Sequence, residues 1–166
     1  MAGPAAAEAA LSLARHLTAT LKDLEPELLG LYWPHRSEFN APALVLDDAT
    51  LAKLSMALPF AQRTTVQMHY RGWNGAAPTI TDECGIPSSD GARVVPDVVL
   101  VPCVGYTDSG HRLGYGGGYF DRWMAQHPDV TTIGIAWSGS AIDAAQLDAQ
   151  PHDQPLTLIL TERGVV

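Results

Sequence analysis

The sequence predicts an α/β fold with a layered, mostly parallel sheet, on three observations. Continuous apolar runs at 98–102, 132–137 and 156–160 are typical of strands that are buried on both faces. Helical patterns separate strand patterns along the chain, and this alternation favours an α/β architecture. With 166 residues, 46% hydrophobic and 17% charged, the chain has the length and composition of one globular domain, 1–166.

The first elements are a helix and a short strand. Residues 5–24 are rich in Ala and Leu, and the apolar residues that recur at helical spacing are Leu13, Leu17, Leu21 and Leu24. Pro26 ends this helix. The apolar run Leu28–Trp33, closed by Pro34, is a candidate strand.

A second helix and a second strand are expected next. Asp47 or Asp48 can cap a helix that runs through Met56. Alternating β-branched and polar residues predict a strand at Thr64–Tyr70. The following stretch, Trp73–Pro87, is rich in Gly and Pro, with room for a short strand at Thr79–Thr81.

The second half of the chain alternates strands with loops and one helix. A buried strand at Val98–Pro102 is followed by a glycine-rich loop, Thr107–Gly118, and then by a helix, Gly118–Gln126. Two further buried strands are expected at Thr132–Trp137 and Leu156–Leu160.

Charge and composition exclude several classes of function. The chain has 10 Lys+Arg against 18 Asp+Glu, a formal net charge of −8, which argues against a nucleic-acid partner. No apolar run reaches the length of a membrane span, and the first residues lack the basic segment of a secretory signal. Cys84 and Cys103 do not form a disulfide framework, so we expect a cytoplasmic protein.

The glycine-rich loop carries the chemistry. It lies between a buried strand and a helix, where backbone N–H groups and a helix N-terminus can bind an anion. It is not a Walker P-loop, because Lys22 and Lys53 are the only lysines and neither is near it. It is not a dinucleotide fingerprint either, because Tyr119 stands where the third glycine should be.

The positive charge that phosphates need must therefore come from Arg112, Arg122 and a metal ion. Asp121 would repel bare phosphates, whereas Mg²⁺ held between them removes the repulsion. The alternative is that the glycines only form a tight turn, with Asp121 a carboxylate in the first turn of a helix.

One segment goes beyond a general pattern. RLGYGGGYFDR, residues 112–122, closely resembles the signature of the 5-formyltetrahydrofolate cyclo-ligase family. Other segments resemble the family in the same order along residues 28–166; they are Leu31–Pro34 with Glu38, Cys84–Pro87, Pro96–Pro102, Pro151–Asp153 and Thr161–Gly164.

The resemblance implies a three-layer sandwich related to the ribose-phosphate isomerase and CoA-transferase group. It implies ATP- and Mg²⁺-dependent closure of 5-formyltetrahydrofolate to 5,10-methenyltetrahydrofolate, with release of ADP and phosphate. The partners would be these small molecules, and the protein would be a monomer.

The family's functional residues carry over by position. Arg112 and Glu38 would be catalytic, and Asp121 and Asp153 would bind Mg²⁺. The ATP site would be formed by Arg112, Leu113, Gly114, Tyr115, Gly116, Gly117, Gly118, Tyr119 and Phe120. The folate site would be formed by Trp33, Glu38, Tyr115 and Tyr119. Taken singly, Glu38 also fits a solvated loop carboxylate, Asp153 a turn former and Trp33 a core residue.

The chain departs from the family at its start. The family begins with a helix whose Lys and Arg reach the ATP phosphates, and this sequence has no clear counterpart; only Arg15 or Lys22 could substitute. Two hypotheses remain: an active cyclo-ligase, or a nucleotide- or folate-binding paralogue without ligase activity. A third is a different phosphoryl-transfer or phosphosugar enzyme on the same fold.

Overall fold

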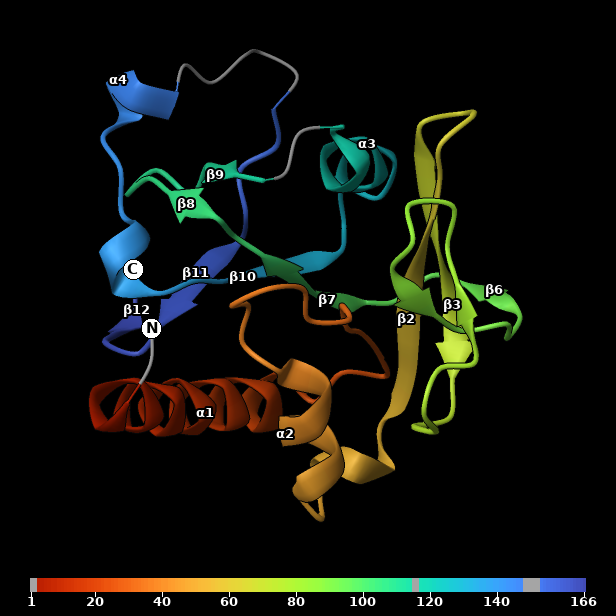
Figure 1. Ribbon diagram of the computed structural model, residues 1–166, viewed down its shortest axis with the longest axis horizontal. Helices are drawn as coiled ribbons and strands as arrows, with labels where there is room; N and C mark the ends of the chain where they lie inside the picture. The colour runs from red at the N-terminus through yellow and green to blue at the C-terminus, as the bar shows by residue number, and fades with distance from the viewer. Residues whose placement is uncertain (1–2, 115–116, 148–152) are drawn as a thin grey trace.

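The computed structural model describes residues 3–114, 117–147 and 153–166. Its centre is an eight-stranded sheet in the order β12-β11-β10-β7-β1-β2-β3-β6 (Figure 1). The strands of this sheet are β1 Leu28–Gly30, β2 Ser55–Gln62, β3 Gln67–Trp73, β6 Arg93–Val94, β7 Val98–Pro102, β10 Thr131–Ile135, β11 Leu158–Thr161 and β12 Gly164–Val165.

The middle of the sheet is parallel and the edges are antiparallel. β11, β10, β7, β1 and β2 are paired in parallel, whereas β12 and β3 run in the opposite direction, and β6 pairs antiparallel with β3. Along β7, Val98 and Leu100 belong to one buried cluster and Val99 and Val101 to the other. The continuous apolar run therefore reflects burial on both faces, as the sequence predicts.

Helices cover both faces (Figure 1). On one face lie α1 Pro4–Leu24 and α2 Ala41–Asp47; Leu13, Leu17 and Leu21 of α1 are fully buried there. On the other lies α3 Tyr119–Gln126, with Trp123 and Met124 buried. The α/β fold is confirmed. None of the helices in the described ranges is long and apolar enough to cross a membrane.

The remaining elements are short. They are the 3-10 turns η1 Leu51–Lys53 and η2 Ser138–Ser140, the helix α4 Ala144–Leu147, and two small hairpins formed by β4 Ile80–Thr81 with β5 Pro87–Ser88 and by β8 Gly105–Tyr106 with β9 Arg112–Leu113.

The helix expected from Asp47 or Asp48 to Met56 is wrong. The helix lies earlier, where the Asn40 side chain accepts a hydrogen bond from Ala43 N–H at 3.2 Å. Asp48 instead caps a turn, accepting from Thr50 and Leu51 N–H at 2.9 and 3.0 Å. Ser55–Gln62 then forms β2.

The strand expected at Thr64–Tyr70 begins later. Arg63–Val66 form the turn between β2 and β3, with Val66 at a φ of +51°. The paired strand therefore runs from Gln67 to Trp73, three residues beyond the predicted end, and its last residue falls in the stretch that is rich in Gly and Pro.

The sheet reverses its order between β1 and β7. From β1 the chain moves to β2 and β3 on one side, and β7 returns to the other side of β1 before leading on to β10. In such sheets the crevice at the carboxyl ends of the two central strands is the place where ligands bind.

Candidate active site at the carboxyl ends of the central strands

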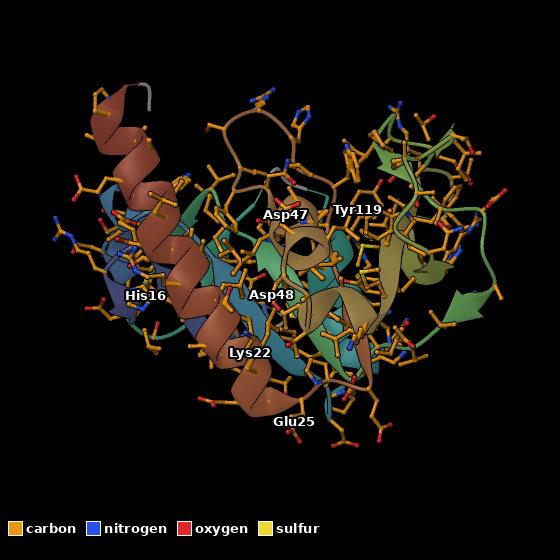
Figure 2. All side chains as sticks on the ribbon, turned by 90° about the horizontal axis from the view of Figure 1, so that it is seen from below. His16, Lys22, Glu25, Asp47, Asp48 and Tyr119 are labelled. Atoms are coloured by element: carbon orange, nitrogen blue, oxygen red, sulfur yellow. The ribbon has the colours of Figure 1, made fainter. Side chains whose placement is uncertain are left out.

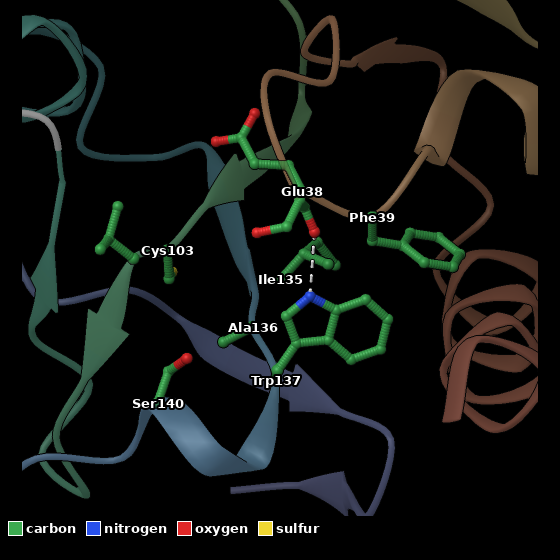
Figure 3. A pocket seen from close by; sticks show the side chains of 9 residues that line it. Glu38, Phe39, Cys103, Ile135, Ala136, Trp137 and Ser140 are labelled. Carbon is green, nitrogen blue, oxygen red and sulfur yellow. Dashed lines mark hydrogen bonds between the residues drawn. The ribbon is translucent and has the colours of Figure 1, made fainter. Parts of the chain in front are cut away.

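A cleft occupies this crevice (Figure 3). It contains about 460 Å³ of empty space, part of it open to solvent. Three segments line it, each following a parallel strand: one after β1, one after β7 and one after β10. The lining residues are Ser37, Glu38, Phe39, Cys103, Val104, Ile135, Ala136, Trp137 and Ser140.

Glu38 is oriented within its own turn. Its Oε1 accepts a hydrogen bond from the His35 backbone N–H at 2.7 Å, and its own N–H donates to the His35 carbonyl at 3.2 Å. Below the turn, the Tyr32 hydroxyl donates to the Phe39 carbonyl at 2.8 Å. Burial raises the pKa of Tyr32 well above its ordinary value, and Glu38 and Cys103 add to this. A neutral phenol therefore supports the Glu38 turn.

Trp137 forms the opposite wall. Its Nε1–H donates to the Ser37 carbonyl at 3.2 Å, and its ring meets Phe39 edge-to-face at 6.3 Å (Figure 3). The next residue, Ser138, donates both its N–H and its hydroxyl to the carboxylate of Glu162. The end of β11 thus holds the turn that carries Trp137.

Arg112 reaches the same place from β9. Its Nη1 donates to the carbonyl of Pro102, the last residue of β7, at 3.2 Å, and its guanidinium lies 5.1 Å from the Phe120 ring centre. Its Nε is buried without a hydrogen-bond partner. Gly114 leaves room for this side chain, because a Cβ there would stand 2.6 Å from Arg112 Nη1.

Cys103 shows that Arg112 and Glu38 converge. Burial raises the pKa of the Cys103 thiol to about 11, while Arg112 lowers it and Glu38 raises it. Both charged groups therefore act on one side chain of the cleft. The geometry agrees: Glu38 lines the cleft with Cys103, and Arg112 binds the carbonyl of Pro102, the residue before Cys103.

The glycine segment leads directly into α3. Gly117 and Gly118 have φ of +72° and +68°, a region that favours glycine. Arg122 donates to the Gly117 carbonyl, so this side chain binds the segment itself. Leu113 is exposed. Tyr115 and Gly116, expected to bind ATP, lie outside the described residues.

Tyr119, the first residue of α3, faces a different segment. Its hydroxyl lies 3.5 Å from Cys84 Sγ, in the turn between β4 and β5. Asp82 fixes that turn by accepting from Cys84 and Ile86 N–H at 2.9 and 3.0 Å. The family-like turn Cys84–Pro87 and the glycine segment are therefore neighbours.

Asp121 and the segment of Asp153 also meet. The Gln154 N–H donates to Asp121 Oδ1 at 3.3 Å, which brings two carboxylate-bearing segments together beside α3. Among the described residues no three His, Cys, Asp or Glu side chains form a metal-binding group. Two carboxylates suit Mg²⁺ when phosphate oxygens and water complete its shell.

Trp33 does not line the cleft. It is half-buried and meets Trp73 edge-to-face at 6.0 Å, on the α1 face of the sheet. Trp73 is itself buried and donates its Nε1–H to the Ala76 carbonyl at 2.8 Å.

The two cations of α1 have other contacts. Lys22 forms an ion pair with Asp48 at 3.2 Å, near the end of α1 that leads into β1 (Figure 2). Arg15 donates to Ser12 on the same helix at 2.9 Å. Neither contact involves the glycine segment.

Sequence reasoning did not predict that Cys103 and Trp137 line the cleft, nor that Ser138 and Glu162 hold the turn that carries Trp137. The expected strand 132–137 includes Trp137. The pairing of β10 with β7 and β11 ends at Ile135, so Trp137 lies beyond the paired part of the strand, at its carboxyl end. The resemblance at Thr161–Gly164 was the one available signal for Glu162.

The model of the 5-formyltetrahydrofolate cyclo-ligase family matches residues 1–162. A 5-formyltetrahydrofolate cyclo-ligase of Mycolicibacterium smegmatis is 38% identical over 73 residues, which span 42% of this chain and 36% of that protein. The one from Haemophilus influenzae is 24% identical over 164 residues, covering 92% of this chain and 85% of the relative.

Solved structures share the fold. A 5,10-methenyltetrahydrofolate synthetase from Mycoplasma pneumoniae superposes with a TM-score of 0.76 at 20% identity, covering 98% of this chain and 90% of that one. The Aquifex aeolicus 5,10-methenyltetrahydrofolate synthetase gives a TM-score of 0.70 at 26% identity, with 92% and 79% covered.

Proposed function

Because the chain belongs to the 5-formyltetrahydrofolate cyclo-ligase family, we propose that it converts 5-formyltetrahydrofolate to 5,10-methenyltetrahydrofolate at the expense of ATP. The observation that supports this most is that Glu38 and Cys103 line the switch-point cleft while Arg112 binds the carbonyl of Pro102, the residue before Cys103, at 3.2 Å. A cation for phosphates and a carboxylate for pterin nitrogens are the two groups that such a reaction needs.

The reaction balances in two steps. The formyl oxygen attacks the γ-phosphorus of ATP, and ADP leaves. N10 of the folate then attacks the activated formyl carbon, the C–O bond breaks, and phosphate departs with the former formyl oxygen as N10 loses its proton. Most of the protein's contribution is positioning and charge stabilisation.

Glu38 would hold the pterin and orient the reacting nitrogens. Its hydrogen bond from His35 N–H engages one carboxylate oxygen at 2.7 Å, so the turn fixes the carboxylate's orientation before substrate binds. Phe39 and Trp137 offer aromatic faces and edges in the same cleft, which suit a flat pterin ring. Tyr115 and Tyr119 of the glycine segment would add to the folate site, Tyr119 from outside this cleft, whereas Trp33 packs against Trp73 away from it.

The ATP phosphates would bind along residues 112–120. Positive φ at Gly117 and Gly118 suits close backbone approach to an anion, and Arg112 supplies charge with a buried Nε that has no partner. Asp121 and Asp153 would hold Mg²⁺, which neutralises charge between the phosphates when bound. We expect the protein to act as a monomer in the cytoplasm.

The test is the formation of methenyltetrahydrofolate, followed by absorbance, from 5-formyltetrahydrofolate, ATP and Mg²⁺. The control omits ATP. Product that depends on ATP supports the ligase. Absence of product, from protein that still binds ATP or folate in calorimetry, would contradict it and favour the binding paralogue.

A further inference from the structure

Two arginines lie directly opposite each other near one edge of the sheet. Arg71 of β3 pairs with Arg93 of β6, so both side chains leave the same face. Like charges at directly opposite positions of an antiparallel pair destabilise it. Within the described ranges neither arginine forms an ion pair, although the chain carries 18 Asp+Glu. An anionic ligand bound between the two guanidinium groups would offset their repulsion.

The Arg71 guanidinium is held in place. Its Nη1 donates to the Ser89 carbonyl at 3.4 Å, and its Cζ lies 3.6 Å above the centre of the Phe60 ring. Its Nη2 remains available to an acceptor, as does the exposed side chain of Arg93. A fixed, planar fork of N–H donors matches a carboxylate better than it matches a spherical anion.

His69 also helps to hold the Arg71 guanidinium in place. Arg71 Nε donates to His69 Nε2 at 3.0 Å, so in the neutral ring the proton resides on Nδ1. Nδ1 is buried and has no hydrogen-bond partner. Burial, Arg93 and Arg71 all lower the pKa of His69, and the ring therefore does not bring a further positive charge of its own.

The arginine pair lies within reach of the cleft. Gly30 at the end of β1 is level with Ala57 and Gly72, and Arg71 lies one residue further toward the carboxyl edge. The cleft lies past the end of β7; from β7 to β3 is three strand spacings, about 14 Å, and from β7 to β6 four, about 19 Å. A folate whose pterin lies beside Glu38 carries its glutamate at the far end of a rigid p-aminobenzoyl spacer of that order of length.

We propose that Arg71 and Arg93 bind the glutamyl carboxylates of the folate substrate. The inference rests on the proposed function, because it takes the cleft at Glu38 to be the pterin site. In this proposal, the β3–β6 edge of the sheet contributes to folate binding, and the chemical step takes place in the cleft.

The test compares 5-formyltetrahydrofolate with its bis-amide, in which both glutamyl carboxylates are carboxamides. R93Q removes an exposed charge and should raise KM for the acid about fivefold, with kcat unchanged. For the bis-amide, R93Q and the wild type should share one KM. R163Q is the matched control, because it removes an exposed arginine next to β12, at the opposite edge of the sheet.

An unchanged KM for the acid in R93Q would overturn the assignment, as would an equal rise for both substrates. R71Q gives a second reading, and R71K, which keeps the charge but loses the fork, should recover only part of the affinity. Calorimetry of both folates without ATP gives the same comparison as binding constants. If the wild type forms no product, the proposed ligase fails while this comparison still decides the tail site.

Discussion

At the level of single residues, the orientation of the Glu38 carboxylate is fixed by a backbone N–H of its own turn. The bond from His35 N–H, at 2.7 Å, would persist if the carboxylate became an amide, since the amide oxygen also accepts. The geometry of the turn and the charge can therefore be separated by one substitution.

We expect E38Q to weaken 5-formyltetrahydrofolate binding about tenfold, because hydrogen bonds to a charged group are worth about 1.5–3 kcal/mol. ATP affinity should change less than twofold. Isothermal calorimetry with each ligand measures both. A larger effect on ATP than on folate would place Glu38 in the wrong subsite.

Asp121 tests the proposed Mg²⁺ site. D121N keeps an oxygen that can accept from Gln154 N–H but loses the negative charge. We expect kcat to fall about 10²-fold, as for loss of one charge-stabilising group in an active site, with a higher Mg²⁺ requirement. Activity measured over a Mg²⁺ titration gives both kcat and the Mg²⁺ requirement, and thermal unfolding shows whether the variant is folded. Unchanged activity and Mg²⁺ dependence would refute the assignment.

Individual residues were predictable where a local motif carried them. Arg112, Gly114 and Asp121 stand in one short segment, and the sequence alone is enough to single them out. Cys103 and Trp137 were not predicted to line the site. Their roles arise from contacts between segments that follow different strands, which no local spacing encodes.

At the scale of elements, the end of β11 stabilises the end of β10 through Glu162. Burial tends to raise the pKa of this carboxyl, but the hydrogen bonds from the Ser138 hydroxyl and N–H outweigh it, so the pKa is lowered from its ordinary value of 4.5. A lowered folded-state pKa gives stability that is present above pH 4.5 and is lost as pH falls through the folded value.

E162Q should therefore be less stable than the wild type at pH 7. The difference in unfolding free energy between the two proteins should become smaller as pH drops below 4.5. Urea unfolding of both proteins at several pH values measures this difference. A difference that stays constant with pH would show that the charge of Glu162 plays no part in this contact.

The central strands also leave no room for extra atoms. A Cβ at Gly30 would lie 2.8 Å from Val99 and 2.9 Å from the Tyr70 ring, whereas at Gly72 the nearest atom would be 3.8 Å away. G30A should lose about 1–3 kcal/mol of unfolding free energy by overpacking. G72A, at the same level of the sheet, is the matched control in urea titrations. Equal losses of unfolding free energy in G30A and G72A would mean that the atoms around Gly30 shift to accept a Cβ at little cost.

Elements were predicted best where burial was two-sided. The strands at 98–102 and 131–135 lie in the sheet centre, and their apolar runs admit few other interpretations. The helix from 47 to 56 was wrong because two aspartates offered competing caps, and Asp48 closes a turn. β2 was missed because Pro59 interrupts its pattern; its Pro59–Gln62 half pairs with β3 but not with β1.

For the whole molecule, the site follows from the order of the strands. β1 and β7 are neighbours although much of the chain lies between them, and the segments that follow them bring Glu38 and Cys103 to one cleft, with Arg112 bound to the carbonyl of Pro102 beside it. The sequence predicted the α/β class and the family's residues, but the convergence depends on sheet order, which only the structure supplies.

In the proposed reaction, phosphate from ATP activates the formyl oxygen in this cleft. The most direct measurement is to supply 5-formyltetrahydrofolate with ¹⁸O in the formyl group, together with ATP and Mg²⁺, and to weigh the released phosphate. We predict one ¹⁸O per phosphate for each methenyltetrahydrofolate formed. Unlabelled phosphate, or ATP turnover without product, would contradict it.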